Sequence, residues 1–220
     1  MIKQRSILIS ILALTTITLF FFDKPIWLAA RSLVAQQPYY NITEWITEFA
    51  LIPFYAVFVV IFAYALIKKN FYLIRLLITY VITQLVFALA LVRIIKVVVG
   101  RGRPGDVPEF LFLSFSFRHN SFPSGHSADA FVSGMFLFYL LKHSKYSACR
   151  YLPLFYAFLV ASYRVLSNAH YPSDVVAGMA IGIMGAWFFI LRLPANKNSG
   201  MQTEAVPARD LSLYRIHFSC

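Results

Sequence analysis

The chain has 220 residues, of which 60% are hydrophobic and only 13% are charged, and its mean hydropathy is +0.68. A soluble domain carries about 25% charged residues, so this sequence could not cover the surface of a soluble fold. The composition excludes an ordinary cytosolic enzyme and a disordered chain, and it indicates an integral membrane protein. The net charge of +11 does not indicate nucleic-acid binding, because the cations fall mostly between apolar segments.

Hydropathy predicts six membrane spans, and therefore an all-α bundle in a single domain of residues 1–220. A helix needs about 20 apolar residues to cross the hydrocarbon. The first span also resembles a signal peptide, because Lys3 and Arg5 precede it, but five more spans follow. We expect residues 194–220 to form a mobile cytosolic tail, since they contain no long apolar run. The spans are predicted at residues 6–22, 49–67, 71–99, 122–141, 151–166 and 174–193.

The Lys and Arg residues near the ends of the spans predict the orientation. Outside the motifs described below, most of them lie in joins on the side of the two termini. Both termini are therefore expected in the cytoplasm, with the motif-bearing loops on the outer face. If the membrane is the inner membrane of a bacterium, the motif-bearing loops face the periplasm or the exterior. Residues 23–48 are expected to form a polar and aromatic connection at the outer headgroup level.

The first motif, Lys96-Val-Val-Val-Gly-Arg-Gly-Arg103-Pro104, lies at the end of the third span. Lys96 and Arg103 are seven residues apart, so both point the same way if the helix continues for two turns past the bilayer. Pro104 would then end the helix, because the residue before a proline avoids the helical conformation. The alternative interpretation is that the two cations simply extend to the lipid headgroups.

The second motif, Pro123-Ser124-Gly125-His126, opens the fourth span. The start of a helix offers free N–H groups and a partial positive charge to an anion. Ser124 can cap the helix or donate a hydrogen bond, and Gly125 allows a phosphate to approach the backbone. The alternative is a plain helix cap followed by an interfacial histidine.

The third motif contains Arg164, His170 and Asp174. His170 and Asp174 are i and i+4, so they lie on one face if the sixth helix begins near them. A carboxylate beside a histidine fixes its tautomer and leaves the other ring nitrogen free to react. Arg164 adds a forked donor suited to phosphate. His-x3-Asp is also a ligand-like spacing for a metal, but Lys96, Arg103 and Arg164 would repel a divalent cation.

Lys-x6-Arg-Pro, Pro-Ser-Gly-His and Arg-x5-His-x3-Asp, in this order, resemble the three-part signature of the phosphatidic acid phosphatase type 2 superfamily, the lipid phosphate phosphatases. The resemblance covers residues 96–174, and the six-span layout with outward motifs is similar to the bacterial members. One position departs from the pattern. The family usually has Ser before the Arg of the third motif, whereas this chain has Tyr163 there and Ser162 one place earlier.

The resemblance implies a role for each matching residue. His170 would be the nucleophile that forms a phosphohistidine, with Asp174 orienting it, and His126 would protonate the leaving oxygen. Family members of this kind need no metal and no other cofactor. The residues implied to hold the phosphate oxygens are Lys96, Arg103, Ser124, Gly125 and Arg164.

Two further residues are auxiliary candidates. Asp129 lies three residues after His126 inside an apolar span, where a carboxylate is costly. It would stabilise protonated His126, be solvated at the interface, or pair with a cation. The loop of residues 105–121 is rich in Phe, and we expect it to rest in the outer interface and guide acyl or prenyl chains while Arg118 approaches the headgroup. The alternative is burial of this loop against neighbouring helices.

The sequence therefore predicts a membrane lipid phosphatase that acts on a phosphomonoester or pyrophosphate of an amphiphilic lipid. Phosphatidylglycerophosphate, undecaprenyl pyrophosphate, phosphatidic acid and lipid A phosphate all suit the resemblance. Two alternatives stay open: a transporter or channel that uses the basic pocket as an anion site, and a phosphotransferase whose acceptor is not water. The expected partners are the lipid substrate and the bilayer, and the sequence predicts no oligomeric state.

Overall fold

The computed structural model describes residues 2–34, 49–105, 110–142 and 144–193. Within these residues every regular element is a helix, and the only extended pairing is an isolated bridge between Arg101 and Phe110. The predicted all-α fold class is confirmed. In chain order the helices are α1 (Ile2–Val34), α3 (Ile52–Ile67), α4 (Phe71–Thr83), the π-helix η1 (Gln84–Leu91), α5 (Val92–Val99), the 3₁₀-helix η2 (Phe117–His119), α6 (Gly125–Lys142), the 3₁₀-helix η3 (Ser147–Cys149), α7 (Leu152–Leu166) and α8 (Pro172–Ile190).

Three stretches of the described helices are long and apolar enough to cross a membrane, namely Ser10–Ser32, Phe71–Val99 and Pro172–Ile190. Helix α3 is a shorter apolar helix. Large apolar side chains cover the outside of the helices, as in α3, where Val60 and Ile67 are exposed. Such a surface suits lipid and not water. The chain is therefore an integral membrane protein.

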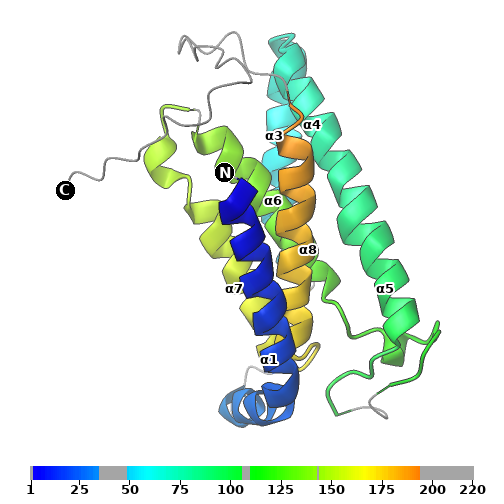
Figure 1. Ribbon diagram of the computed structural model, residues 1–220. Coiled ribbons are helices and arrows are strands. Elements are labelled where there is room, and N and C mark those ends of the chain that lie inside the picture. The colour runs from blue at the N-terminus through cyan, green and yellow to red at the C-terminus, as the bar shows by residue number, and fades with distance from the viewer. Residues whose placement is uncertain (1, 35–48, 106–109, 143, 194–220) are drawn as a thin grey trace.

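Helix α6 lies at the centre of the bundle, where it packs against α7 and α8, and α1 packs against the outside of α8 (Figure 1). Small residues recur every four positions in α8 at Gly178 and Gly182, and they allow α6 and α8 to approach closely. A Cβ atom at Gly178 would lie 2.3 Å from the Ser124 carbonyl oxygen, and one at Gly182 would lie 2.4 Å from that of Ala128.

Helix α1 is longer than predicted. The expected first span ended at residue 22 and a polar connection was expected from residue 23, but the helix continues to Val34. Its 33 residues span about 50 Å at 1.5 Å per residue, which exceeds the hydrocarbon thickness. The extension is stabilised by tertiary contact, because Asp23 and Trp27 are buried. The rest of the expected connection, residues 35–48, lies outside the described residues.

The third predicted span, residues 71–99, matches the continuous helix of α4, η1 and α5, which ends at Val99 and does not continue through the first motif. Gly100 adopts a left-handed conformation with φ of +57°, and its N–H donates to the Lys96 carbonyl oxygen at 2.9 Å. This is a common way for a helix to end, and glycine adopts it without strain. Arg103 therefore lies in the following loop. The condition under which Lys96 and Arg103 would share a helix face is therefore not met, and Pro104 does not end the helix.

The ends of α5 and α7 and the start of α8 lie at the same end of the bundle, and the second half of α1 reaches this end on the side of α7 and α8 (Figure 1). The start of α6 joins this group, because the Ser124 N–H donates to the Asp174 carbonyl oxygen at 2.9 Å. The three sequence motifs are thereby brought to one end of the molecule.

Candidate active site

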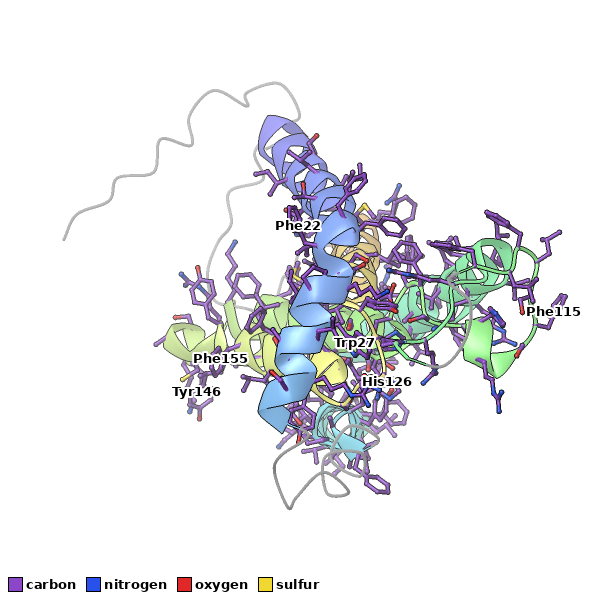
Figure 2. The ribbon with its side chains drawn as sticks, turned by 90° about the horizontal axis from the view of Figure 1, so that it is seen from below. Phe22, Trp27, Phe115, His126, Tyr146 and Phe155 are labelled. Carbon is purple, nitrogen blue, oxygen red and sulfur yellow. The ribbon has the colours of Figure 1, made fainter. Side chains whose placement is uncertain are left out.

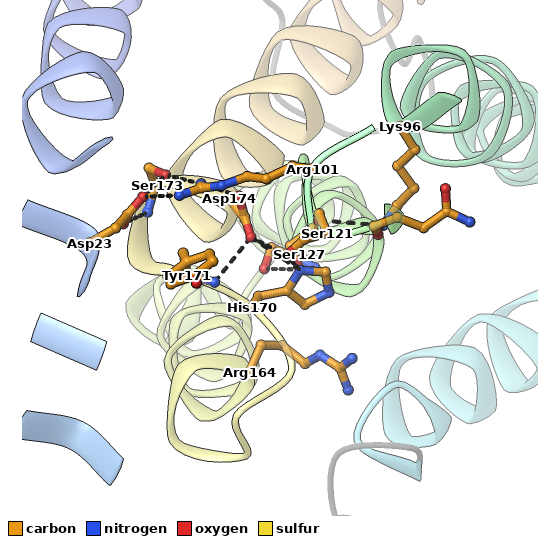
Figure 3. Close-up of polar contacts among 12 residues, drawn as sticks. Asp23, Lys96, Arg101, Ser121, Ser127, Arg164, His170, Tyr171, Ser173 and Asp174 are labelled. Atoms are coloured by element: carbon orange, nitrogen blue, oxygen red, sulfur yellow. Dashed lines mark hydrogen bonds and ion pairs between the residues drawn. The ribbon is translucent and has the colours of Figure 1, made fainter. Parts of the chain in front are cut away.

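Asp174 is fully buried in the first turn of α8 and binds donors with both carboxylate oxygens (Figure 3). Its Oδ1 accepts a hydrogen bond from Arg101 Nη1 at 2.7 Å. Its Oδ2 accepts from the Tyr171 N–H at 3.0 Å and from the Ser121 hydroxyl, and it lies 3.6 Å from His170 Nδ1. The carboxylate is therefore held in one orientation and faces the imidazole.

His170 lies just before α8, and only 2% of its surface is exposed. Its backbone N–H donates to the Arg164 carbonyl oxygen at 3.1 Å, which ties the loop to the end of α7. Its Nδ1 lies 3.5 Å from the Ser121 hydroxyl as well as beside Asp174. A proton on Nδ1 facing the carboxylate leaves the lone pair of Nε2 available as a nucleophile.

The His170 imidazole is held in its neutral form. Burial lowers its pKa from 6.5 to about 3, the hydrogen bond with Asp174 opposes this change, and the positive charges of Lys96 and Arg164 add to it. At neutral pH the ring therefore keeps an unprotonated nitrogen, which nucleophilic attack requires.

Lys96 and Arg103 are fixed by backbone groups around the second motif. The Lys96 ammonium donates to the carbonyl oxygen of Asn120 and lies 3.5 Å from that of Ser121. The backbone N–H of Arg103 donates to the Arg118 carbonyl oxygen at 3.0 Å. Lys96 from α5 and Arg103 from the loop after it are thus placed by long-range contacts with residues 118–121.

Lys96 and Arg164 lie close enough to both His126 and His170 to interact electrostatically with each imidazole, and Arg103 acts on His126. Arg164 is buried at the end of α7, and its guanidinium extends past the His170 ring (Figure 3). The structure therefore brings the three predicted cations and both predicted histidines into one region. A cluster of fixed positive charge suits an anion with several oxygens, such as phosphate.

Ser124 and Gly125 start α6. The Ser124 hydroxyl oxygen accepts hydrogen bonds from the Ser127 N–H at 3.4 Å and from the Ser127 hydroxyl at 2.9 Å, so Ser124 caps the helix. A Cβ atom at Gly125 would meet nothing closer than Val92, at 3.7 Å. Packing within the described residues therefore does not require glycine here, and its backbone stays open to a ligand.

The His126 side chain is half-buried in the first turn of α6 (Figure 2) and makes no hydrogen bond or ion pair with another side chain in the described part of the chain. It borders a cavity of about 310 Å³ between α6 and η1. An imidazole that is not committed to a protein partner can exchange a proton with a ligand. The cavity is lined by Leu51, Gln84, Leu85, Ala88, Leu89, Gly125, His126 and Asp129.

Asp129 accepts its hydrogen bonds from neutral side chains. The donors are the Tyr55 hydroxyl, the Gln84 amide at 2.8 Å and the Ser133 hydroxyl at 3.4 Å. Among the described residues none of these bonds involves His126, so stabilisation of protonated His126 by Asp129 stays a hypothesis. An unchanged pH–rate profile in Asp129→Asn would remove it. The donors come partly from other helices, so spacing within α6 could not reveal them.

Two residues that the sequence interpretation missed connect α1 to this site. Arg101 Nη2 lies 2.8 Å from Asp23 Oδ2, and Arg101 Nη1 also binds the Ser173 hydroxyl at 2.8 Å. Arg101 lies within the first motif, but it is not one of the two cations, Lys96 and Arg103, that define the motif. The signal for Asp23 was a carboxylate directly after an apolar span, where acids are rare and commonly functional.

Large apolar side chains of the aromatic loop are exposed, although Ser114, Asn120 and Ser121 of the same loop are buried. Phe112 is 74% and Phe115 77% exposed, and Phe115 lies at the edge of the molecule (Figure 2). The alternative of burial against neighbouring helices is wrong for these residues. Arg118 is also exposed, and it contributes its carbonyl oxygen to the placement of Arg103. Its contact with a headgroup stays a prediction, and residues 106–109 lie outside the described residues.

Comparison with known proteins agrees with this geometry. The family model of the PAP2 superfamily matches residues 72–198. The chain is 34% identical to a lipid A 1-phosphatase of Rhizobium etli over 135 residues, which are 58% of this chain and 54% of that protein. It is 32% identical to a lipid A 4'-phosphatase of Bacteroides thetaiotaomicron over 104 residues, 43% of this chain and 44% of that protein. The chain thus spans about half the length of these curated relatives.

A solved structure has the same fold. The crystal structure of a transmembrane PAP2-type phosphatidylglycerolphosphate phosphatase from Bacillus subtilis aligns with a TM-score of 0.61 and 25% identity. The alignment covers 84% of this chain and 94% of that chain. The similarity therefore extends well beyond the three motifs.

Proposed function

Because the chain belongs to the PAP2 superfamily, we propose that it is a membrane lipid phosphatase that hydrolyses the phosphomonoester or pyrophosphate of an amphiphilic lipid. The observation that carries the proposal is the placement of His170. Its imidazole is buried, its Nδ1 lies 3.6 Å from Asp174 Oδ2, and the positive charges of Lys96 and Arg164 act on it.

In the first step, His170 Nε2 attacks the phosphorus atom. A P–N bond forms while the P–O bond to the leaving group breaks, and His126 donates a proton to the leaving oxygen. Asp174 stabilises the positive charge that develops on the phosphorylated imidazole, since its carboxylate faces Nδ1. The products are the dephosphorylated lipid and a phosphohistidine.

In the second step, a water molecule attacks the phosphohistidine while His126 accepts one of its protons. The P–N bond breaks, inorganic phosphate leaves, and His170 returns to its neutral form. In both steps the phosphate oxygens bind to cations, to a serine hydroxyl and to a backbone N–H that the protein holds in position, so little reorganisation is needed as charge develops. These groups belong to Lys96, Arg103, Arg164, Ser124 and Gly125.

The proposed topology has six spans in one domain, with both termini in the cytoplasm and the site at the outer face of a bacterial inner membrane. The distribution of Lys and Arg supports this orientation. It is also supported by the position of the motifs, which lie together at one end of the bundle (Figure 1). A lipid in the outer leaflet would then reach the site without crossing the membrane. Lipid A phosphates, which appear in the names of the curated relatives, are candidate substrates together with phosphatidylglycerophosphate, phosphatidic acid and undecaprenyl pyrophosphate.

The decisive experiment measures phosphate release from a panel of these lipids by the purified chain in detergent, with a chelator present. We expect hydrolysis that survives the chelator and falls at least about 10³-fold in His170→Ala, because the nucleophile is removed. Brief reaction with a ³²P-labelled lipid should label wild type but not His170→Ala. Anion or lipid transport that persists in His170→Ala without hydrolysis would favour a transporter. Transfer of the label to a second lipid would favour a phosphotransferase.

A further inference from the structure

Asp23 of α1 is buried against the start of α8, with 2% of its surface exposed. Its Oδ1 accepts a hydrogen bond from the Ser173 N–H at 2.8 Å, and its Oδ2 accepts from the Ser173 hydroxyl. The same Oδ2 lies 2.8 Å from Arg101 Nη2 (Figure 3). Asp23 thus caps the first turn of α8 from another helix and binds the guanidinium at the same time.

Arg101 connects Asp23 with Asp174. Its second terminal nitrogen, Nη1, donates to Asp174 Oδ1 at 2.7 Å. Aromatic rings lie close to the guanidinium, with its carbon 4.3 Å from the Tyr171 ring centre and 4.7 Å from that of Phe20. The planar guanidinium is therefore held both at its nitrogens and by ring contacts, a geometry that lysine could not reproduce.

This connection determines which oxygen of Asp174 faces the nucleophile. Because the carboxylate group is planar, binding Oδ1 to Arg101 places Oδ2 beside His170 Nδ1. Asp23, Arg101 and Asp174 together carry one net negative charge, and Asp174 is the member of this group that faces His170. That charge is suited to stabilise an imidazole that becomes positive when it is phosphorylated.

We propose that Asp23 is a positioning residue of the phosphatase site, acting on His170 through Arg101, Ser173 and Asp174. This inference rests on the proposed function, because it requires His170 to be the nucleophile. Asp23 lies outside residues 72–198, which the family model matches, and outside all three motifs. Helix α1 therefore supplies part of the active site as well as an anchor in the membrane.

The test compares Asp23→Asn with wild type for hydrolysis of a lipid phosphate in detergent. Asparagine keeps the shape and an acceptor for the Ser173 N–H but removes the charge that binds Arg101. We expect kcat to fall about 10- to 100-fold, the range that is common when a residue that orients an active-site side chain is removed. KM should change less than about threefold, because Asp23 does not touch the substrate. The rate of phosphohistidine formation should fall by the same factor. Lys24→Gln, which neutralises the exposed neighbour on α1, is the matched control.

A double-variant cycle separates positioning from a merely structural role. If Asp23 acts through Asp174, the Asp23→Asn and Asp174→Asn pair should have nearly the kcat of Asp174→Asn alone. The inference would be overturned if the losses in kcat of the two single variants multiplied in the double variant. It would also be overturned if Asp23→Asn changed only KM or left kcat unchanged. Should Asp23→Asn fail to fold, Ser173→Ala decides, because it removes the hydroxyl shared by Asp23 and Arg101 and leaves both charges. It should lower kcat about three- to tenfold at constant KM, and an unchanged kcat would overturn the inference.

The two proposals fail in distinguishable ways. Absence of lipid phosphate hydrolysis by wild type, or full activity in His170→Ala, contradicts the proposed function itself. An active wild type that depends on His170 but not on Asp23 or Ser173 contradicts only the positioning role.

Discussion

The Gln84 amide nitrogen donates a hydrogen bond of 2.8 Å to Asp129 Oδ1, and this bond joins the π-helical segment of the third membrane helix to α6 next to His126. The carboxylate lies in an apolar helix, where an acid costs about 2.5–3.5 kcal/mol on insertion scales. The hydroxyls of Tyr55 and Ser133 also bind it. Asp129 is therefore a structural connection between α3, η1 and α6, on the wall of the cavity that His126 borders.

This connection predicts strong coupling between the two residues. Asp129→Leu leaves the Gln84 amide with fewer acceptors in an apolar region, and we expect it to lower the free energy of unfolding by about 1–3 kcal/mol. Adding Gln84→Leu removes the donor as well and should recover part of the loss. Thermal unfolding of both single variants and the double variant in detergent measures the coupling. If the stability losses of the two single variants simply add in the double variant, the bond between Gln84 and Asp129 contributes no specific stability.

The end of α5 predicts a severe effect of Gly100→Ala. A Cβ atom there would lie 1.7 Å from the Leu111 carbonyl oxygen, and the residue would keep a left-handed conformation. The loop must move, and with it Arg101, so we expect a loss of about 3 kcal/mol or more in stability together with most of the activity. Gly105→Ala is the control. Its φ is +84°, but its nearest neighbour is 3.6 Å away in Trp27, so only backbone strain of about 1 kcal/mol is expected. Equal effects of the two variants would contradict the steric argument.

The pKa of His170 predicts a contribution to acid sensitivity. The unfolded chain binds a proton on this ring below pH 6.5, whereas the folded chain binds it only near its lowered pKa of about 3. The stability from this group is therefore fully present above pH 6.5 and decreases as the pH falls toward 3. At pH 5 the expected loss is about 2 kcal/mol, by linkage. In His170→Gln the decrease in Tm between pH 7.5 and 5 should be smaller than in wild type. An identical decrease would mean that the ring is not held neutral.

The exposed aromatic loop predicts a difference between substrates. Phe112→Ser and Phe115→Ser remove rings that would lie in the membrane interface, each worth about 1.5–3 kcal/mol when buried in an apolar environment. We expect kcat/KM to fall about tenfold for long-chain lipids in vesicles and to change little for a soluble aryl phosphate. Phe155→Ser is the control, since Phe155 is exposed on α7 on the other side of the bundle in Figure 2. Equal losses on both kinds of substrate would show that the loop does not guide lipid chains.

Local sequence properties predicted the helices well where bilayer burial alone forms them. The third span, residues 71–99, has the predicted bounds, and four other predicted spans match α3, α6, α7 and α8 to within about three residues at each end. The prediction was wrong for the end of the first helix, because α1 continues past residue 22, where Asp23 and Trp27 are buried. The helix does not continue through the first motif, because Gly100 ends α5 in a left-handed conformation next to Leu111. Hydropathy contains neither kind of information.

The sequence by itself predicted the kind of protein: a membrane-embedded chain whose cations, two histidines and carboxylate follow the order of the PAP2 superfamily signature. The sequence also predicted that His170 and Asp174 lie together, and they do, although His170 precedes α8 and the two residues therefore do not share a face of that helix. Only the tertiary structure decided which residues hold the Asp174 carboxylate in place. Arg101 and Asp23 are 78 residues apart and Ser173 and Asp23 are 150 apart, so no local spacing could pair them. They meet because buried charged groups must find partners and because helix packing brings α1 to the start of α8.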